Sequence, residues 1–261
     1  MHFTQLILTN LGLIIAAMSL LWLVSIRVKD ASIVDLCWGL GFVIVAWATA
    51  FQTGASDLRA IMLLALTTLW GLRLSGYLLW RNYGKGEDKR YQEMRDKHGG
   101  RFWWVSFFTV FLLQGLLMWF ISLVVQSGMF HAGKLGIGFF GWLGFAVWCV
   151  GFFFESVGDF QMARFKARPD TEGEVMDRGL WRYTRHPNYF GDFCIWWGLF
   201  LLAATAQSWW TIGSPLLMSF LLLKVSGVSM LESDIEDRRP KYAQYKRETN
   251  AFFPWFPADG A

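Results

Sequence analysis

Seven apolar stretches, each about twenty residues long, alternate with polar segments along the 261-residue chain. They lie near residues 5–26, 32–52, 59–80, 103–127, 135–157, 188–206 and 209–231. An α-helix of about 20 apolar residues is long enough to cross the hydrocarbon core of a bilayer. The pattern therefore predicts an all-α integral membrane protein, a bundle of seven transmembrane helices.

The composition supports this prediction. Hydrophobic residues make up 54% of the chain and aromatic residues 18%, more than a soluble domain carries. The first apolar stretch has neither a basic start nor a small-residue cleavage site before Arg27, so we interpret it as a retained helix and not as a signal peptide. Cys37, Cys149 and Cys194 lie in or at the edges of apolar stretches, which argues against a disulfide framework.

The basic residues are distributed unevenly between alternate loops. Of the 24 Lys and Arg residues, 20 follow the first, third, fifth or seventh apolar stretch. Cytoplasmic loops collect Lys and Arg, so this bias predicts an external N-terminus and a cytoplasmic C-terminus. The same bias accounts for the pI near 9.0 without a nucleic-acid partner. The predicted cytoplasmic segments 81–102, 158–187 and 232–261 are also the long ones, so we expect the chemistry on that side. Within the first of them, EMRDKHGG is typical of a helix ended by glycine.

Several ionisable residues lie within or at the ends of the apolar stretches, where each needs a partner or a role because charge is costly at that depth. They are Asp35, Arg73, Glu155, Asp159, Asp192, Lys224 and Glu232. Asp35 and Lys224 could also be residues that extend to the membrane surface. Arg73 shares a helical face with Trp70, Tyr77 and Arg81, and this face suits the wall of a substrate or cofactor cavity.

Residues 178–192, RGLWRYTRHPNYFGD, form a basic, aromatic and acidic cluster between two apolar stretches. Arg182, Arg185 and His186 offer cationic donors that suit a phosphate, and Asn188 and Asp192 lie where the next stretch begins. A large anionic cofactor at the membrane face would use such a set.

The segment RYTRHPNYFGD, followed by LESDIEDRRPKYAQYKRETNAFFPWF, resembles the C-terminal half of the steroid 5α-reductase family and of the related sterol C14 and delta-7 reductases. The tail also resembles isoprenylcysteine and phospholipid methyltransferases. The resemblance covers Glu155 to Pro257 well. The earlier WGLRLSGYLLWRNYGKGEDKRY resembles the reductase branch, and Asp35 lies where the reductases carry a glutamate that polarises the substrate carbonyl. The chain departs from them at Asp35 by one methylene and at Trp70, where the mammalian-type enzymes have a tyrosine.

The resemblance implies reduction by NADPH of the 4,5 double bond of a 3-keto-4-ene steroid or a related lipid enone. A buried carboxyl that keeps its proton could stabilise the charge that develops on the carbonyl oxygen. The implied catalytic residues are Asp35 and Tyr77, and the implied substrate-binding residues are Asp35, Trp38 and Trp70. The implied cofactor-binding residues are Arg73, Arg90, Tyr91, Asp159, Arg164, Lys166, Arg168, Trp181, Arg185, Asn188, Tyr189, Asp192, Glu232 and Tyr245.

Other classes of function remain as alternatives. A membrane methyltransferase would use the same region for S-adenosylmethionine, whereas a transporter or structural membrane protein would leave the polar cluster unexplained. The chain has no Rossmann, Walker or G-x-S-x-G motif and no clustered metal ligands. We expect one domain over 1–261, with substrate-side helices in 1–157 and the cofactor-binding half in 158–261. We also expect a monomer in a bacterial inner membrane, with lipids as partners and the cofactor site facing the cytoplasm.

Overall fold

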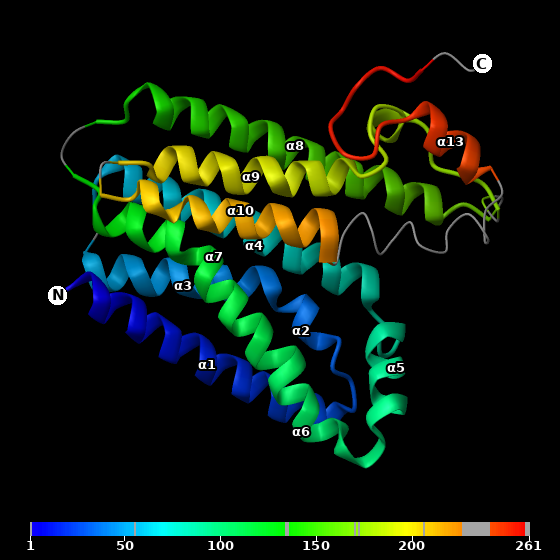
Figure 1. The fold of residues 1–261 in the computed structure, drawn as a ribbon, viewed down its shortest axis with the longest axis horizontal. Helices are drawn as coiled ribbons and strands as arrows, with labels where there is room; N and C mark the ends of the chain where they lie inside the picture. Colours follow the sequence, from blue (N-terminus) through cyan, green and yellow to red (C-terminus); the bar gives the residue numbers. More distant parts are fainter. Residues whose placement is uncertain are drawn as a thin grey trace. The chain divides into compact units, whose positions relative to one another are not determined.

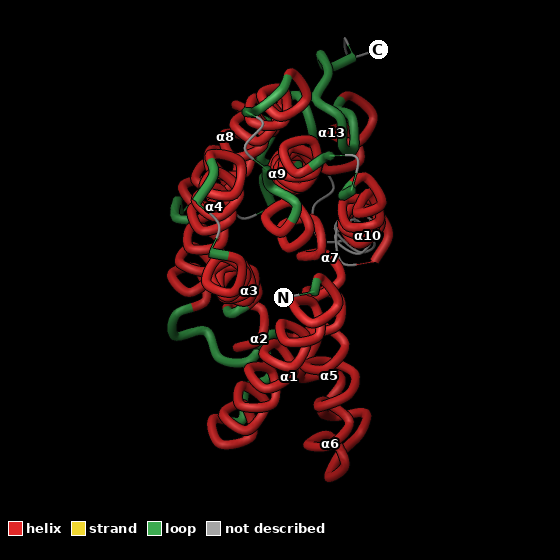
Figure 2. The backbone as a smooth tube through the Cα atoms, turned by 90° about the vertical axis from the view of Figure 1, so that its left-hand side faces the viewer, coloured by secondary structure: helices red, strands yellow, loops and turns green. Residues whose placement is uncertain are grey.

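In a computed structural model, the chain consists of helices joined by loops (Figure 2). The structure describes residues 2–54, 56–133, 136–169, 171, 173–205, 207–225 and 241–258. These residues form helices and no strands, which confirms the prediction of an all-α protein. The chain divides into two compact units, residues 1–137 with 203–211 and residues 138–202 with 212–261.

The first unit is built around four helices that pack against one another. Helix α3 packs against α4 and α7, and α1 packs against α7 (Figure 1). The elements of this unit are α1 (Phe3–Val28), α2 (Ile33–Leu36), α3 (Trp38–Thr53), α4 (Leu58–Asn82), α5 (Lys89–His98), η1 (Gly99–Arg101), α6 (Phe102–Ser106), η2 (Phe107–Leu112) and α7 (Leu113–Phe130).

The second unit contains two long helices that run side by side in opposite directions, α8 (Phe139–Lys166) and α9 (Pro187–Ala203) (Figure 1). Its other described elements are η3 (Gly179–Arg182), α10 (Gly213–Phe220), η5 (Leu221–Val225) and α13 (Tyr242–Glu248). The short turn η4 (Trp209–Ile212) leads into α10.

Each of the seven predicted stretches coincides with helix in the residues that the structure describes. Among the residues that the structure describes, four helical segments are long and apolar enough to cross a membrane: Phe3–Val28, Leu58–Asn82, Lys89–Phe130 and Phe139–Lys166. Two shorter apolar segments are Trp38–Thr53 and Trp209–Val225. The chain is therefore an integral membrane protein. Seven crossings and the orientation of the ends stay predictions.

Three of the predicted stretches are not continuous α-helices, and one of them, 209–231, begins with the 3-10 turn η4 and continues after α10 into the π-helical η5. The stretch 32–52 is divided at Cys37 into the one-turn α2 and the longer α3, so Asp35 lies in a separate turn and not inside the apolar helix as predicted. The stretch 103–127 contains the π-helical η2, and just before it Nε1 of Trp22 on α1 donates to the carbonyl oxygen of Trp103 in α6 at 2.7 Å. Apolar periodicity does not encode such changes of helix type.

Glycines at two-turn spacing bring α8 and α9 into close contact. A Cβ at Gly144 would lie 2.6 Å from the carbonyl oxygen of Gly198, and one at Gly151 would lie 2.5 Å from that of Gly191. Gly158 faces the ring of Pro187 in the same row. Small residues allow such close backbone approach, which strengthens van der Waals packing between membrane helices.

A buried polar network joins three helices of the first unit. Nδ2 of Asn10 on α1 donates to Oγ1 of Thr49 on α3 and to Oε1 of Gln126 on α7, each at 2.9 Å. Gln52 donates to Oδ1 of Asn10 at 2.8 Å, and Gln126 donates to Ser122 at 2.9 Å. Because these groups satisfy one another, the network stabilises packing without leaving a buried polar group unpaired.

Candidate functional site

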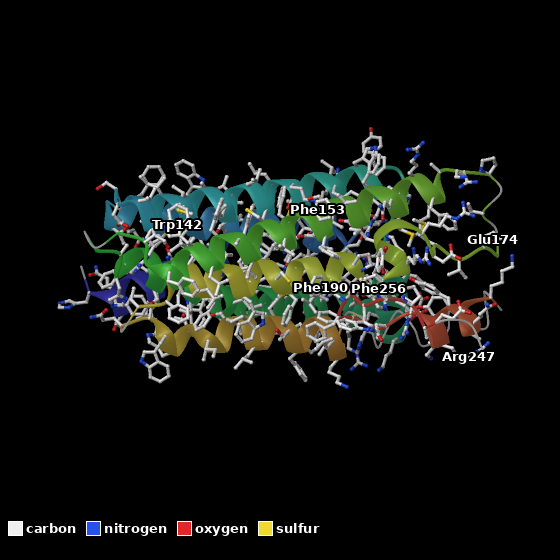
Figure 3. The ribbon with its side chains drawn as sticks, turned by 90° about the horizontal axis from the view of Figure 1, so that it is seen from above. Trp142, Phe153, Glu174, Phe190, Arg247 and Phe256 are labelled. Carbon is white, nitrogen blue, oxygen red and sulfur yellow. The ribbon has the colours of Figure 1, made fainter. Side chains whose placement is uncertain are left out.

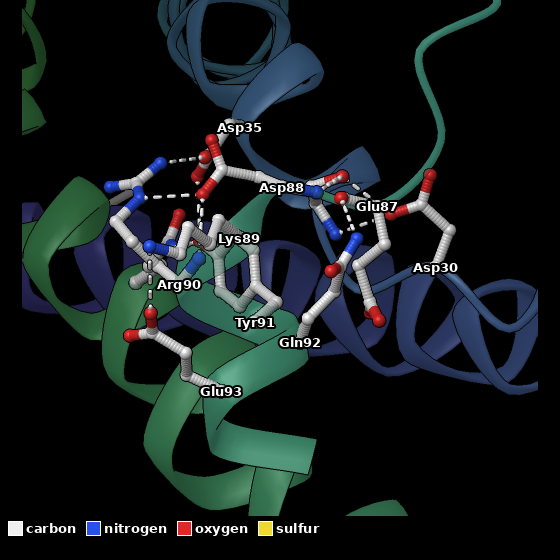
Figure 4. Close-up of polar contacts among 11 residues, drawn as sticks. Asp30, Asp35, Glu87, Asp88, Lys89, Arg90, Tyr91, Gln92 and Glu93 are labelled. Carbon is white, nitrogen blue, oxygen red and sulfur yellow. Dashed lines mark hydrogen bonds and ion pairs between the residues drawn. The ribbon is translucent and has the colours of Figure 1, made fainter. Parts of the chain in front are cut away.

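Asp35 is the centre of a polar cluster in the first unit. Its Oδ2 accepts a bond from the guanidinium NH2 of Arg90 at 2.9 Å, and its Oδ1 accepts a bond from the hydroxyl of Tyr91 at 2.8 Å (Figure 4). Asp35 comes from α2, whereas Arg90 and Tyr91 come from the first turn of α5. The structure thus places the predicted catalytic carboxyl in contact with two of the predicted cofactor-binding residues.

The residue just before α5 orients these two side chains toward Asp35. Asp88 is the N-cap of α5, and its Oδ1 accepts bonds from the backbone N–H of Arg90 at 3.0 Å and from Nε of Arg90 at 2.9 Å. The same carboxylate therefore caps the helix and holds the guanidinium. The helix ends at Gly99, whose φ of 52° favours glycine, so the predicted glycine stop is confirmed.

A second carboxylate fastens α5 to the loop before α2. Oε1 of Glu87 accepts the backbone N–H of Ala31 at 2.7 Å, and the two carboxylate oxygens accept Nε and NH2 of Arg95 at 2.9 and 2.8 Å. The Arg95 guanidinium also lies 4.4 Å from the ring centre of Phe102. The bidentate pair with Arg95 holds the Glu87 carboxylate in place, and the bond from Ala31 links it to the loop before α2, which supports the contact between Arg90 and Asp35.

The two carboxylates differ in their electrostatics. Burial raises the pKa of Asp35 above its ordinary value, although the nearby Arg90 and the hydrogen bond from Tyr91 act in the opposite direction. For Glu87, burial also acts to raise the pKa, but the bonds from Arg95 and Ala31 outweigh it and hold the pKa below its ordinary value. Asp35 is thus the carboxyl that more readily takes up a proton.

An aromatic wall follows directly after Asp35 in the sequence. The ring centres of Trp38 and Phe42 lie 5.5 Å apart, and those of Phe42 and Trp70 also lie 5.5 Å apart. Trp70 is fully buried. The close approach of α3 and α4 at Gly39 and Gly71 makes this possible, because a Cβ at Gly71 would lie 2.5 Å from the carbonyl oxygen of Gly39. The two predicted substrate-binding tryptophans therefore belong to one apolar cluster.

The predicted face of α4 is arranged around Tyr77. The guanidinium carbons of Arg73 and Arg81 lie 5.4 and 5.7 Å from the centre of the Tyr77 ring. These distances suit cation–π interactions. The phenol that contacts Asp35 is Tyr91. The catalytic role of Tyr77 stays a prediction.

In the second unit, several predicted cofactor residues meet where α9 begins beside α8. Nδ2 of Asn188 donates to Oδ1 of the buried Asp159 at 3.3 Å. The ring of Tyr189 stacks on that of His186 with the centres 5.7 Å apart, and Asp192 lies half-buried one turn further along α9. The RHPNYFGD segment is thus ordered by contacts on both helices.

Three other predicted cofactor residues have structural partners. Arg185 is buried, and its NH1 donates to the carbonyl oxygens of Lys246 at 3.0 Å and Thr249 at 2.5 Å, at the end of α13. Nε1 of Trp181 donates to the carbonyl oxygen of Gly158 at 3.0 Å, and the Tyr245 hydroxyl donates to the carbonyl oxygen of Trp181. These contacts attach the tail to the loop before α9. Their role toward a cofactor stays a prediction.

The remaining predicted cofactor residues lie at the end of α8 or outside the described residues. Arg164, Lys166 and Arg168 are exposed in or just after the last turn of α8. Glu232 lies outside the residues that the structure describes.

The sequence interpretation missed four residues around Asp35. They are Glu87, Asp88 and Arg95, described above, and Gln114 at the start of α7, whose Nε2 donates to the Tyr91 hydroxyl at 3.2 Å. A single amide within an apolar stretch is a signal that could have identified Gln114. The charged residues gave no such signal, because a loop rich in both signs offers many equivalent pairings.

Comparison with known proteins places the chain in a family. A family model described as "Protein of unknown function (DUF1295)" matches residues 21–249. The chain belongs to this family. It is similar to a protein of Schizosaccharomyces pombe described as "Uncharacterized protein C594.04c", with 25% identity over 271 residues that cover 90% of this chain and 76% of the relative. No solved structure gives a significant match.

Proposed function

We propose that this DUF1295 protein is a membrane reductase that uses NADPH to reduce the carbon–carbon double bond of a lipid enone, such as a 3-keto-4-ene steroid. The family is loosely related to steroid-reductase-like membrane proteins, which supports this direction. The observation that carries the proposal is the contact of Asp35 with Arg90 and Tyr91. The resemblance implies that Asp35 binds the substrate carbonyl and that Arg90 and Tyr91 bind the cofactor. Substrate and cofactor must meet for hydride transfer.

The surroundings of Asp35 suit a lipid with one polar end. Trp38 and Trp70 give an apolar wall through Phe42, and Asp35 precedes that wall by three residues. Phe42 and Trp70 are buried behind Trp38, so a flat polycyclic lipid would lay its rings against the partly exposed Trp38. Its carbonyl oxygen would then face the carboxyl, and a hydrogen bond from that group would stabilise the developing enolate.

The Arg90 guanidinium keeps donors that suit an anionic cofactor, which would supply the hydride. A guanidinium has five N–H donors, and the bonds to Asp35 and Asp88 use Nε and one nitrogen of the fork. The side chain is 47% exposed, so its remaining donors can reach a phosphate. If Arg90 turns from Asp35 to a phosphate, Asp35 loses the nearby cation that lowers its pKa. Burial then raises that pKa with less opposition and favours the protonated carboxyl, which can donate to a carbonyl.

The test is ligand binding and turnover with detergent-purified protein. We expect NADPH to raise the unfolding temperature and to be oxidised when enone lipids are added. Arg90→Gln should weaken NADPH binding by about 1.5–3 kcal/mol, as expected for loss of a charged hydrogen-bond donor. Lys89→Gln is the matched control, because the neighbouring Lys89 is exposed and pairs with Glu93 at 3.5 Å.

Two results would contradict the proposal. Stabilisation by S-adenosylmethionine and not by NADPH would favour a methyltransferase. Equal NADPH affinity in Arg90→Gln and the parent would remove Arg90 from the cofactor site. Asn188→Ala tests the second unit in the same way, with an expected loss of about 1–3 kcal/mol in NADPH binding.

A further inference from the structure

Three large aromatic side chains near the C-terminus are exposed. Phe253, Trp255 and Phe256, called the tail aromatics below, are 60%, 69% and 75% exposed. Their neighbour Phe252 is buried. Adjacent exposed aromatic groups of this size mark a surface that meets an apolar or interfacial environment.

The tail that carries these side chains is fixed in place by main-chain bonds. The backbone N–H of Arg185 donates to the carbonyl oxygen of Asn250 at 2.9 Å, and that of Trp255 donates to the carbonyl oxygen of Tyr183 at 2.9 Å. Oγ1 of Thr184 donates to the carbonyl oxygen of Phe252 at 2.8 Å. The exposure of the tail aromatics therefore belongs to an ordered surface.

Ring contacts show which part of α9 the tail packs against. The ring centre of Phe253 lies 6.1 Å from that of Phe190 and 5.8 Å from that of Phe193, and Phe252 also contacts both rings. Phe190 and Phe193 belong to the first two turns of α9. The tail thus lies beside the start of α9 and not beyond its end.

The contact of α9 with α8 gives the depth at which the start of α9 lies in the membrane. Gly158 of α8 faces Pro187, the first residue of α9. Gly158 follows Phe139, the first residue of the apolar α8, by nineteen residues, which at about 1.5 Å per residue is about 29 Å. The hydrocarbon core is about 30 Å thick, so the start of α9 lies near its far boundary. Figure 3 shows Trp142 toward one end of this unit, Phe190 nearer its middle, and Phe256 and then Arg247 further toward the other end.

Basic residues accompany the tail aromatics. Lys246 and Arg247 are exposed in the last turn of α13, and Arg247 lies beyond Phe256 along the unit (Figure 3). The neighbouring Glu248 accepts a bond from Gln244 at 2.8 Å. Aromatic side chains at the hydrocarbon boundary and cations further out match the order of layers in a phospholipid surface.

We propose that the tail aromatics bind the headgroup region of the bilayer that holds α8, with Lys246 and Arg247 against lipid phosphates. The bilayer then holds the tail on the loop 183–186 and on the start of α9. The ligand of this surface is an anionic phospholipid membrane. The proposal stands independently of the reductase function.

The test measures lipid contact in the full-length protein in nanodiscs. Phe256→Cys is labelled with a fluorophore, and quenching by lipids with a shallow spin label is compared with quenching by a water-soluble metal ion. Gln244→Cys, on the exposed side of α13, is the matched control. Labelled parent protein gives the contribution of Cys37, Cys149 and Cys194, which is subtracted. Trp255→Cys repeats the measurement at a second exposed position.

We expect several-fold stronger lipid quenching at position 256 than at position 244, and the reverse order for the aqueous quencher. Adding phosphatidylglycerol should increase lipid quenching at position 256, and Lys246→Gln with Arg247→Gln should abolish that increase. Quenching at position 256 by the aqueous ion alone would overturn the proposal, because the tail would lie in water. Protection from both quenchers would overturn it too, since protein and not lipid would then cover the tail. A lipid response that the double variant leaves unchanged would overturn the role of the two cations.

Discussion

The Tyr91 hydroxyl donates a 2.8 Å hydrogen bond to Oδ1 of Asp35, although 56 residues of sequence separate the two. The bond exists because Asp88 caps α5 and Glu87 fastens its start to the loop before α2. A carboxyl, a phenol and a guanidinium thereby form one cluster beside an aromatic wall. The following predictions test this cluster, the packing that supports the second unit, and the orientation of the chain.

If the proposed reductase function holds, Asp35→Leu should lower the turnover of a 3-keto-4-ene steroid on the order of a hundredfold, because one donor to the developing enolate would be lost. Asp35→Asn should lose less, since an amide can still donate, and Asp35→Glu should remain active if the added methylene fits. The measurement is NADPH oxidation at saturating substrate.

The control for Asp35 is Asp96→Asn, which changes an exposed carboxylate on α5. This variant should keep the parent turnover. If Asp35→Leu reduces the steroid as fast as the parent, Asp35 is a structural residue, and the carbonyl donor must be sought elsewhere.

Glu87 should make the attachment of α5 depend on pH. The folded-state pKa of Glu87 lies below its ordinary value of 4.5, so its stabilising contribution is present above about pH 4.5 and is lost as the pH falls through the folded-state pKa. Hydrogen exchange of the α5 amides should therefore accelerate in acid.

Glu87→Gln should show faster α5 exchange already at neutral pH, by a free energy of about 1–3 kcal/mol, and less dependence on pH. Glu93→Gln, at an exposed carboxylate of the same helix, should behave as the parent. Equal acid sensitivity in Glu87→Gln and the parent would show that another group controls the docking of α5.

Gly151→Ala should destabilise the second unit by about 1–3 kcal/mol, because the added Cβ would lie 2.5 Å from the carbonyl oxygen of Gly191. Gly138→Ala, at the N-cap of the same helix, meets no atom within 4 Å and is the control. Thermal unfolding in detergent measures both. A parental unfolding temperature in Gly151→Ala would mean that α8 and α9 can separate without loss of stability.

A topology reporter fused after Ala261 should report the cytoplasm, and one inserted near Gly133 should report the opposite side. The reason is that 20 of the 24 basic residues follow alternate apolar stretches. A periplasmic signal from the fusion at Ala261 would contradict the span count and the predicted side of the site.

Apolar periodicity located two of the long helices to within a few residues, whereas the stretch predicted at 135–157 is the helix Phe139–Lys166, which extends nine residues into the predicted loop 158–187. The stretch predicted at 5–26 is the helix Phe3–Val28, and the stretch at 59–80 is Leu58–Asn82. This succeeded because a membrane helix satisfies its own backbone and needs little more than length and hydrophobicity. The interruption at Cys37 and the π-helical turn at Phe107–Leu112 were not predictable, since apolar periodicity does not encode a change of helix type.

The sequence by itself determined that the chain is helical and membrane-embedded, and its resemblance to the reductases singled out Asp35 as a catalytic residue and Arg90 and Tyr91 as cofactor-binding residues. Only the tertiary structure decided that Arg90 and Tyr91 contact Asp35, that Arg185 binds a carbonyl oxygen at the end of α13, and that Glu87 holds α5 in place. The physical reason is the distance along the chain over which each property is decided. Hydrophobicity acts residue by residue along a helix, whereas the partner of a charged side chain depends on a few ångströms in space that many sequence-distant residues could occupy.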